Sequence, residues 1–192
     1  MNTKNKDTLA AESWAKRILK SDIRILDTET TGLGTNDQIC QIGICDGRGN
    51  IVMDTLVKPA VPINRKAFQI HGISEEALRD APRFPDIYEE LVNAVSYKPV
   101  IIYNVNFDRQ MIRQTCDFYN LRYPRCREFH CAMQWYSQWH GWKKRKDGTY
   151  RWRKLPGGDH SAIGDCLAVL KLIQKMAGYN LGEEAEIIPL AR

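Results

Sequence analysis

Two carboxylates lie two residues apart at the end of an apolar segment near the start of the chain. Asp27 and Glu29 belong to the sequence ILDTETTGL, in which residues 23–28 predict a β-strand. Side chains at positions i and i+2 of a strand point to the same face of a sheet, so both carboxylates face one side. Neighbouring carboxylates repel each other unless a cation lies between them. The pair indicates either a cation site or a solvated strand end.

Asp108 is a third candidate carboxylate and follows another buried segment, in the sequence YNVNFD. Residues 99–104 predict a strand and residues 107–119 predict a helix, which places Asp108 in the first helical turn. A negative charge at this position also stabilises a helix end, and Asn104 and Asn106 are suitable helix caps. The residue types alone therefore leave a structural role at the helix start open.

The sequence DHSAIGD contains His160 and Asp165 at the start of the last predicted helix, 161–177. A separation of five residues corresponds to about 140° around an ideal helix, so the two side chains cannot share the centre of one helical face. We expect His160 on the preceding loop or in the first turn, with Ser161 near the helix cap. An acid beside the apolar stripe of this helix requires a partner, and a metal ion would provide one.

Strands and helices alternate around these candidate residues. The first three strands follow one another, and a turn at residues 47–49 joins the second to the third, which predicts antiparallel pairing. An amphipathic helix with Asp7 as its expected N-cap precedes them. This order favours an α/β fold in which helices cover a sheet. The predicted strands are 23–28, 38–46, 50–59, 99–104 and the start of 129–140, and the predicted helices are 7–20, 74–80, 86–96, 107–119, the end of 129–140 and 161–177.

The length of 192 residues is that of one domain, with little room for a second. We expect an appended helix over 1–22, the main domain over 23–178 and a C-terminal tail over 179–192. Hydrophobic residues make up 43% and charged residues 27% of the chain, which excludes a wholly disordered chain, a collagen and a coiled-coil rod. A packed hydrophobic core is therefore expected.

The six cysteines form no C-x-x-C pair, and the N-terminus has no apolar segment typical of a signal peptide. We therefore expect reduced thiols and a cytoplasmic location. No apolar run approaches the roughly 18 to 20 uncharged residues that span a bilayer, so no association with a membrane is expected.

Positive charge is concentrated in the segment 143–154, KKRKDGTYRWRK, which holds seven basic residues and one acid. The net charge of the whole chain is +5, so the remainder is close to neutral. Such local basicity predicts either a patch that binds a polyanion or a solvated face. The Asp147-Gly148 pair predicts a turn, so the segment is expected to form a hairpin. The residues of the candidate patch are Lys143, Lys144, Arg145, Lys146 and Arg151.

Three motifs occur in a fixed order along the chain: D-x-E after a strand, N-x-x-F-D after another strand, and H-x4-D before a late helix. Together they resemble the DEDDh family of 3′ to 5′ exonucleases, the DnaQ-like proofreading and RNase T group. The sequence HGISEEAL at 71–78 resembles a further segment of this family. The resemblance covers about residues 23–178 and implies a ribonuclease H-like fold, a mixed five-stranded sheet flanked by helices.

The resemblance also implies a role for each motif residue. Asp27, Glu29, Asp108 and Asp165 would bind two divalent cations, Mg²⁺ or Mn²⁺, and His160 would be the general base. Carboxylate oxygens suit such hard cations, and a neutral histidine can accept the proton of an attacking water. The residues expected at the terminal nucleotide are Thr28, Thr30, Leu33, Asn104 and Phe107.

The activity that follows from these roles is a metal-dependent 3′ to 5′ exonuclease that releases nucleoside monophosphates. The expected substrate is a single-stranded or frayed 3′ end, with DNA favoured over RNA; an exoribonuclease similar to RNase T is the alternative. A polymerase or a repair complex is a candidate partner. The chain departs from the family at Tyr103, where histidine is usual, and at Cys166, where alanine is common. Neither change removes a proposed ligand.

Two further hypotheses belong to other classes of protein. A zinc-binding interaction module would use cysteines and histidines whose spacing matches no standard zinc finger. A nuclease-like fold without activity would serve only to bind nucleic acid, but retention of all five catalytic residue types argues against it. For His71 we favour a structural role or one near the substrate over metal binding. The zinc candidates are Cys116, Cys126, His130, Cys131 and His140.

Overall fold

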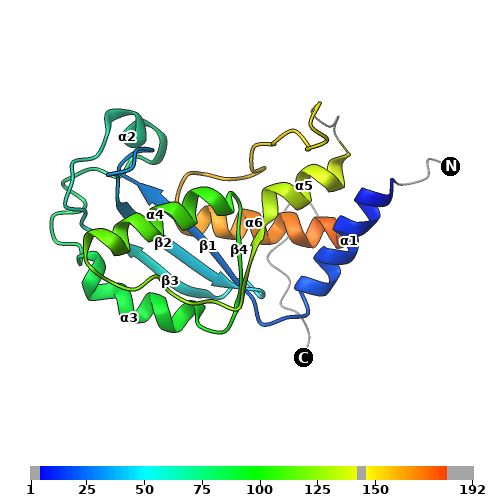
Figure 1. Ribbon diagram of the computed structural model, residues 1–192, viewed down its shortest axis with the longest axis horizontal. Helices are drawn as coiled ribbons and strands as arrows, with labels where there is room; N and C mark the ends of the chain where they lie inside the picture. Colours follow the sequence, from blue (N-terminus) through cyan, green and yellow to red (C-terminus); the bar gives the residue numbers. More distant parts are fainter. Residues whose placement is uncertain (1–4, 142–145, 181–192) are drawn as a thin grey trace.

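The computed structural model describes residues 5–141 and 146–180, which form a five-stranded sheet with helices on both faces (Figure 1). The strand order is β3-β2-β1-β4-β5, and the sheet is mixed because it contains parallel and antiparallel pairs. The expected α/β architecture is therefore confirmed. The strands are β1 Arg24–Thr30, β2 Ile39–Asp46, β3 Ile51–Leu56, β4 Pro99–Ile102 and β5 Glu128–Cys131.

The central strand β1 pairs with β2 on one side and with β4 on the other. The β1–β2 and β2–β3 pairs are antiparallel, as the sequence predicts, whereas β4 runs parallel to β1 and to β5. Parallel neighbours end at the same edge of a sheet. The two motif carboxylates on β1 and Asp108, which follows β4, therefore come to one edge.

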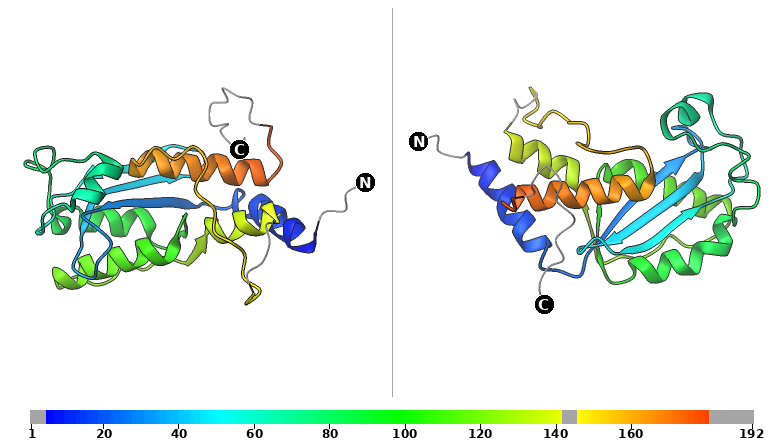
Figure 2. Two further views of the ribbon diagram at one scale, coloured as in Figure 1. Left: turned by 90° about the horizontal axis from the view of Figure 1, so that it is seen from above. Right: turned by 180° about the vertical axis from the view of Figure 1, so that it is seen from behind.

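Figure 2 shows the sheet between two helical layers. Helix α6 (Ala162–Met176) covers one face, and α3 (Phe84–Val95) and α4 (Val105–Phe118) cover the other. Successive residues of β1 serve different layers, since Ile25 packs with the α6 layer and Leu26 packs with the layer of α3 and α4. This alternation is the two-residue period of a strand.

Helix α1 (Lys6–Ile18) lies beyond one end of the sheet and packs against α5 (Ala132–His140) and α6. Trp14 anchors it: the side chain is 1% exposed, and its ring stacks on Trp135 with centroids 5.0 Å apart. The Trp14 Nε1–H donates to Nδ1 of His130 at 3.4 Å. The amphipathic helix expected at the N-terminus is thus confirmed.

The predicted N-cap of this helix is wrong by two residues. Asn5 caps α1, and its side-chain oxygen accepts a hydrogen bond from the Asp7 N–H at 2.8 Å. Asn and Asp are about equally good caps, so residue type does not choose between them.

The predicted helix at 74–80 is also wrong, because residues 75–80 form turns. A helix lies earlier instead, α2 at Arg65–His71. It begins at Asn64, whose side chain accepts from the Lys66 N–H at 2.9 Å, and ends at Gly72, which has φ 71°. Glycine adopts this left-handed conformation at low cost, which is why it terminates the helix.

The basic segment 143–154 lies partly outside the described residues, which lack 142–145. The described part contains the expected turn, in which Asp147 accepts from the Thr149 N–H at 2.9 Å. The first strand of the predicted hairpin falls outside the described range, so the hairpin stays a prediction.

All six cysteines are free thiols, as expected for reduced side chains. Among the helices of residues 5–141 and 146–180, none is long and apolar enough to cross a membrane.

Candidate active site

Three carboxylates from opposite ends of the chain meet at the edge where β1 ends. Asp27 and Glu29 extend from β1 and Asp165 from the first turn of α6, and one oxygen of each lies within 4.8 Å of the others. In the described ranges, no other group of three or more His, Cys, Asp or Glu side chains is placed to hold a metal ion. The prediction that Asp27 and Glu29 share one face of β1 is therefore confirmed, and Asp165 of α6 meets them on that face.

Asp165 is oriented by the loop that carries His160. Its Oδ1 accepts from the backbone N–H of Asp159 at 3.0 Å and from that of His160 at 3.3 Å. Ser161 caps α6 and accepts from the Gly164 N–H, so His160 lies on the loop, as expected. His160 has φ 63°, a conformation that is uncommon for a residue with a side chain and is often found at functional sites. The hydrogen bond from the His160 backbone to Asp165 thus holds the two motif residues next to each other.

The fourth motif carboxylate, Asp108, is buried at 3% exposure in the first turn of α4. Its Oδ1 accepts two hydrogen bonds from Thr28, one from the backbone N–H at 3.1 Å and one from the hydroxyl at 2.9 Å. Asp108 is not one of the three carboxylates whose oxygens lie within 4.8 Å of one another. Its negative charge nevertheless raises the pKa of both Asp27 and Glu29, so all four carboxylates share one electrostatic environment.

Burial and mutual repulsion make these groups difficult to ionise without a cation. Burial raises the pKa of Asp27, and the charges of the other three carboxylates raise it further. The pKa of Glu29 rises to about 8 and that of Asp108 to about 7, in both cases chiefly through burial. None of the four carboxylates forms a salt bridge with a described lysine or arginine. An all-oxygen donor set with no cationic partner fits a hard divalent cation.

A pocket of about 550 Å³ adjoins Glu29 and contains most of the predicted nucleotide-contacting residues. Leu33 is 81% exposed at its rim. Asn104 is not among the lining residues; it precedes α4, and its carbonyl oxygen accepts from the Phe107 N–H at 3.0 Å. The predicted residues that line the pocket are Thr28, Thr30, Leu33 and Phe107.

Helix α2 forms the opposite wall of this pocket, and the sequence did not indicate it. Its contribution comes from Asn64, Lys66, Ala67, Ile70 and His71. The cap residue Asn64 and the terminating Gly72 were the available signals.

His71 joins α2 to the end of β1. Its Nδ1 accepts from the Ile73 N–H at 3.0 Å, so its Nε2 carries the proton and donates to the Thr30 carbonyl at 3.2 Å. Burial lowers the pKa of His71, and the charge of nearby His160 lowers it further. A neutral His71 is therefore a fixed part of the pocket wall and is not a metal ligand in this arrangement.

Tyr103, where the family usually has histidine, connects β4 to the chain before His160. Its hydroxyl donates to the Arg153 carbonyl at 2.6 Å, and the Arg153 guanidinium lies 5.4 Å from the Tyr136 ring centroid. Cys166, where alanine is common, is fully buried, and its thiol donates to the Gly43 carbonyl at 3.3 Å. Tyr103 thus contacts the chain that precedes His160, and Cys166 attaches α6, which carries Asp165, to β2. Neither residue belongs to the carboxylate cluster.

The zinc candidates do not come together among the described residues, because the fold uses them separately. The Cys126 thiol donates to the Glu128 carbonyl, and the Cys131 thiol donates to the Tyr103 carbonyl. His130 is held by Trp14, as described above. The zinc-module hypothesis is therefore not supported.

Of the candidate basic patch, Lys146 and Arg151 are described and exposed. The other three residues, Lys143, Lys144 and Arg145, lie outside the described range.

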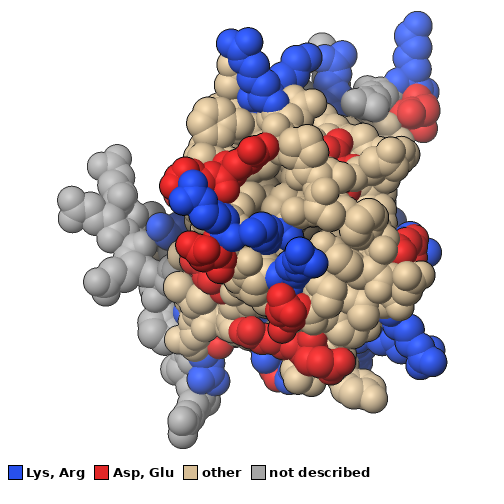
Figure 3. Space-filling model, turned by 90° about the vertical axis from the view of Figure 1, so that its left-hand side faces the viewer, with Lys and Arg blue, Asp and Glu red and all other residues tan. Residues whose placement is uncertain are grey.

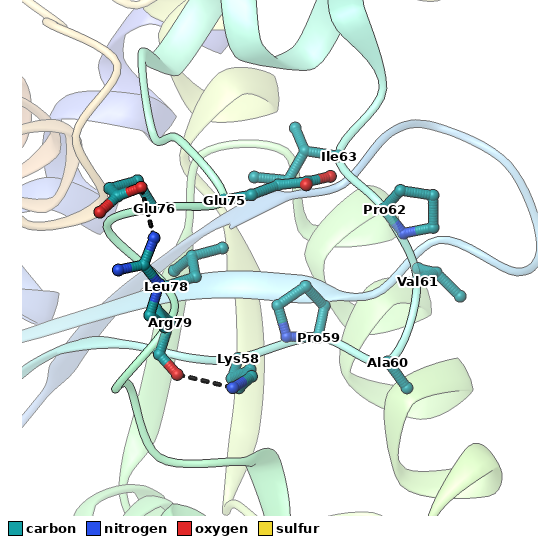
Figure 4. Close-up of a pocket in the computed structure, with 10 residues that line it drawn as sticks. All are labelled: Lys58, Pro59, Ala60, Val61, Pro62, Ile63, Glu75, Glu76, Leu78 and Arg79. Atoms are coloured by element: carbon teal, nitrogen blue, oxygen red, sulfur yellow. Dashed lines mark hydrogen bonds and ion pairs between the residues drawn. The ribbon is translucent and has the colours of Figure 1, made fainter.

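A second pocket, of about 570 Å³, lies under the chain that follows β3 (Figure 4). Three of its charged side chains have partners within the pocket wall: Lys58 Nζ donates to the Arg79 carbonyl at 2.6 Å, and Arg79 pairs with Glu76 at 2.6 Å. None of the motif residues lines it, so this pocket is separate from the carboxylate cluster.

Comparison with known proteins connects this geometry to one family. The exonuclease family model RNase_T matches residues 25–173. An uncharacterized exonuclease, CP81 of Escherichia phage 186, is 35% identical over 179 residues, which cover 85% of this chain and 92% of the relative. Exodeoxyribonuclease 10 of Escherichia coli K12 is 30% identical over 176 residues, or 86% of this chain and 74% of the relative.

Solved structures agree with this assignment. Exonuclease X, in complex with 5′ overhanging duplex DNA, superposes with a TM-score of 0.56 at 29% identity, over 86% of this chain and 98% of that one. A 3′-exonuclease that recognises the histone mRNA stem-loop has a TM-score of 0.63 over 81% of both chains, and its 13% identity supports the fold alone. The ribonuclease H-like fold is thus confirmed. The chain belongs to the DEDDh, DnaQ-like group of RNase T exonucleases and is a 3′ to 5′ exonuclease.

Proposed function

We propose that the chain hydrolyses the last phosphodiester bond of single-stranded or frayed DNA 3′ ends and releases nucleoside monophosphates. The proposal rests chiefly on three carboxylates, Asp27, Glu29 and Asp165, whose oxygens lie within 4.8 Å of one another, and on the pocket of about 550 Å³ that Glu29 lines. A pocket beside such a cluster can hold the terminal nucleotide of a chain end.

Asp27, Glu29, Asp108 and Asp165 would hold two divalent cations, Mg²⁺ or Mn²⁺. Such cations activate a water molecule and stabilise the negative charge that develops on the departing 3′ oxygen. The chain itself fixes where the carboxylates lie. Two backbone N–H groups orient Asp165, and the N–H and hydroxyl of Thr28 orient Asp108.

His160 would accept the proton of the attacking water. Its backbone N–H lies 3.3 Å from Asp165 Oδ1, which keeps the residue beside the carboxylate cluster. Its strained backbone conformation sets the direction in which the ring leaves the chain. A general base of this kind typically contributes a factor of about 10² to 10⁴ to the rate.

The terminal nucleotide would occupy the pocket between the end of β1 and α2. Leu33 and Phe107 offer apolar surface to the base, and the Thr28 and Thr30 backbone lies on the β1 side. The Thr30 hydroxyl is engaged with the Gly32 carbonyl at 2.9 Å, so that side chain supports the wall. His71 supports the wall from α2.

DNA is the proposed substrate because one relative is named for DNA and one similar structure contains it, both at about 30% identity. Exodeoxyribonuclease 10 is 30% identical, and exonuclease X, at 29% identity, was solved with 5′ overhanging duplex DNA. The structure that recognises an RNA stem-loop is 13% identical and carries no argument about substrate.

Matched DNA and RNA oligonucleotides of one sequence, labelled at the 5′ end, test the proposal. We expect stepwise shortening from the 3′ end, faster on DNA, that requires Mg²⁺ or Mn²⁺ and stops in excess chelator. A 3′-phosphate should block the reaction, since the pocket holds the free terminal nucleotide. Faster turnover of RNA would overturn the DNA preference, and full turnover in chelator would overturn the role of the cations.

A further inference from the structure

Five arginines lie on two adjoining segments, outside the carboxylate cluster and outside the basic segment 143–154. Two lie on α4 and three on the chain that connects α4 to β5, which Figure 1 shows next to each other. Four are exposed, and Arg109 is half-buried. We call this set the arginine surface: Arg109, Arg113, Arg122, Arg125 and Arg127.

Aromatic rings hold the two helical arginines in place. The guanidinium carbon of Arg109 lies 4.5 Å from the Phe129 ring centroid, and that of Arg113 lies 5.2 Å from the Tyr123 ring centroid. The positive charges of both arginines act on the Tyr123 hydroxyl, partly opposing the rise in its pKa that burial causes. The connecting segment therefore packs directly on this face of α4. A guanidinium group stacked on a ring loses less freedom when it binds an anion.

No described carboxylate neutralises these arginines. None of the five forms a salt bridge within residues 5–141 and 146–180. The nearest acids along the chain are Asp117 and Glu128, and Glu128 pairs with His130. The end of the molecule at the left of Figure 1 differs, since positive and negative side chains are interspersed there (Figure 3). The five guanidinium groups are thus not ion-paired within the described residues and can bind an anion.

The arginine surface begins beside the candidate active site. Arg109 directly follows Asp108, and Arg113 lies one helical turn further along α4. At about 1.5 Å per residue, Arg113 is about 7 to 8 Å from Asp108 along the helix axis. The two helical arginines therefore lie within one to two helical turns of the candidate active site, where the nucleotides that precede a bound 3′ end would lie.

We propose that the arginine surface binds backbone phosphates of the nucleic-acid substrate beyond its terminal nucleotide. The inference rests on the proposed function, because it takes the substrate to be a polynucleotide. Planar guanidinium groups bind phosphate through paired hydrogen bonds, and every nucleotide carries such a phosphate whatever its base. The contact is therefore independent of sequence and raises affinity for long substrates over short ones. The phosphates belong either to the cleaved strand or to its complement.

The test removes three of the exposed charges and leaves Arg109, which packs beside the site, in place. The variant R113Q/R125Q/R127Q is compared with K16Q/R17Q/K20Q, which removes three exposed cations from the end of α1 and its flank. Binding is measured for 4-nucleotide and 20-nucleotide single strands and for a duplex with a 5′ overhang, with Ca²⁺ in place of Mg²⁺, over a range of salt concentrations. Cleavage of the 4-nucleotide strand is measured with Mg²⁺.

We expect the arginine variant to bind the long substrates at least 10-fold more weakly. Its slope of log affinity against log salt should become shallower by about 2 to 3, since each lost phosphate contact removes about 0.7 to 0.9. The control variant should match the wild type, and both variants should cleave the 4-nucleotide strand normally. A loss confined to the duplex assigns the phosphates to the complementary strand, and an equal loss on the single strand assigns them to the cleaved strand.

Unchanged affinity and salt slope for both long substrates would overturn the proposal. Equal weakening of binding in the control variant would also overturn it, because the loss would then depend on the net charge of the protein and not on the position of the arginines. Failure of the proposed function has a different signature: the wild type itself would then release no nucleotide from any substrate.

Discussion

Gly43 on β2 lies directly opposite Asp27 on β1, and the first turn of α6 occupies the space that a side chain at position 43 would need. A Cβ atom built on Gly43 would lie 2.5 Å from the carbonyl carbon of Ala162 and 2.5 Å from the Ile163 nitrogen. Backbone atoms cannot yield as a flexible side chain does. The close approach of α6 to the sheet, which brings Asp165 to Asp27, therefore requires glycine at this position.

Gly43→Ala should displace the start of α6 and lower kcat on single-stranded DNA at least about 10-fold. Overpacking of this kind should also cost about 1 to 3 kcal/mol of stability. Gly47→Ala in the same hairpin is the control, since the nearest atoms to its Cβ would belong to the flexible Ile23 side chain, at 3.0 and 3.3 Å, and the nearest backbone atom would be 3.9 Å away. Equal activity of the two variants would show that the packing of α6 on Gly43 does not set the site.

Thr28→Val should lower kcat/KM about 10- to 100-fold. The change removes the 2.9 Å hydroxyl bond to Asp108 and keeps the backbone N–H bond at 3.1 Å. Hydrogen bonds to charged groups contribute about 1.5 to 3 kcal/mol. Thr28→Ser, which keeps the hydroxyl, should retain near-normal activity. Steady-state kinetics at saturating Mg²⁺ would decide the matter, and a fully active Thr28→Val enzyme would refute the role of the hydroxyl.

Asp108→Asn should stabilise the protein in chelator at pH 8 but not at pH 4. The folded chain raises the pKa of Asp108 to about 7 from an ordinary 3.8, chiefly through burial. Between these values the folded state holds a proton that the unfolded state has lost, so the metal-free protein loses stability as the pH rises. Asparagine removes this penalty and still accepts from Thr28.

The expected gain from Asp108→Asn at pH 8 is about 1 kcal/mol or more, equivalent to about 2 to 4 °C in Tm per kcal/mol at this chain length. Thermal melts at both pH values measure it. The same variant should lose nearly all exonuclease activity with Mg²⁺. A lower Tm than wild type at pH 8 would contradict the electrostatic argument.

His160→Gln should keep affinity for divalent cations and lose a factor of about 10² to 10⁴ in kcat. His160→Gly should be as inactive yet more stable than His160→Ala, by about 1 to 2 kcal/mol, because residue 160 has φ 63° and only glycine adopts it without strain. Chemical denaturation and calorimetric cation binding separate these effects. Wild-type turnover by His160→Gln from pH 6 to 9 would exclude the residue as the base.

Leu33→Ala should raise KM for single-stranded DNA about 10-fold without a loss of stability. Leu33 is 81% exposed, and burial of such a side chain against a base is worth about 1.5 to 3 kcal/mol. The loop that presents it is held by Asp37, whose carboxylate accepts from the Thr31 hydroxyl at 2.8 Å and the Gly34 N–H at 2.6 Å. Leu9→Ala, at a 51% exposed position on α1, is the control and should leave KM unchanged.

The periodicity of apolar residues was sufficient to predict a strand or helix wherever that element buries an apolar face. The alternation in β1 predicted that Asp27 and Glu29 face one side, and the capping preference of serine placed Ser161 before α6. Helix α2 was missed because none of its residues is buried, so no apolar stripe marks it. The segment 74–80 was mistaken for a helix on its sequence pattern, although only Leu78 within it is buried.

The sequence by itself determined the strands, the main helices and the order of the three motifs, because these depend on contacts between near neighbours in the chain. Only the tertiary structure decided that Asp165 reaches Asp27, because that contact joins the α6 layer to β1 and depends on the missing side chain of Gly43. It also decided that α2 lines the pocket and that Arg109 and Arg113 of α4 pack on Phe129 and Tyr123. Contacts between distant segments follow from the packing of layers, which no local pattern records.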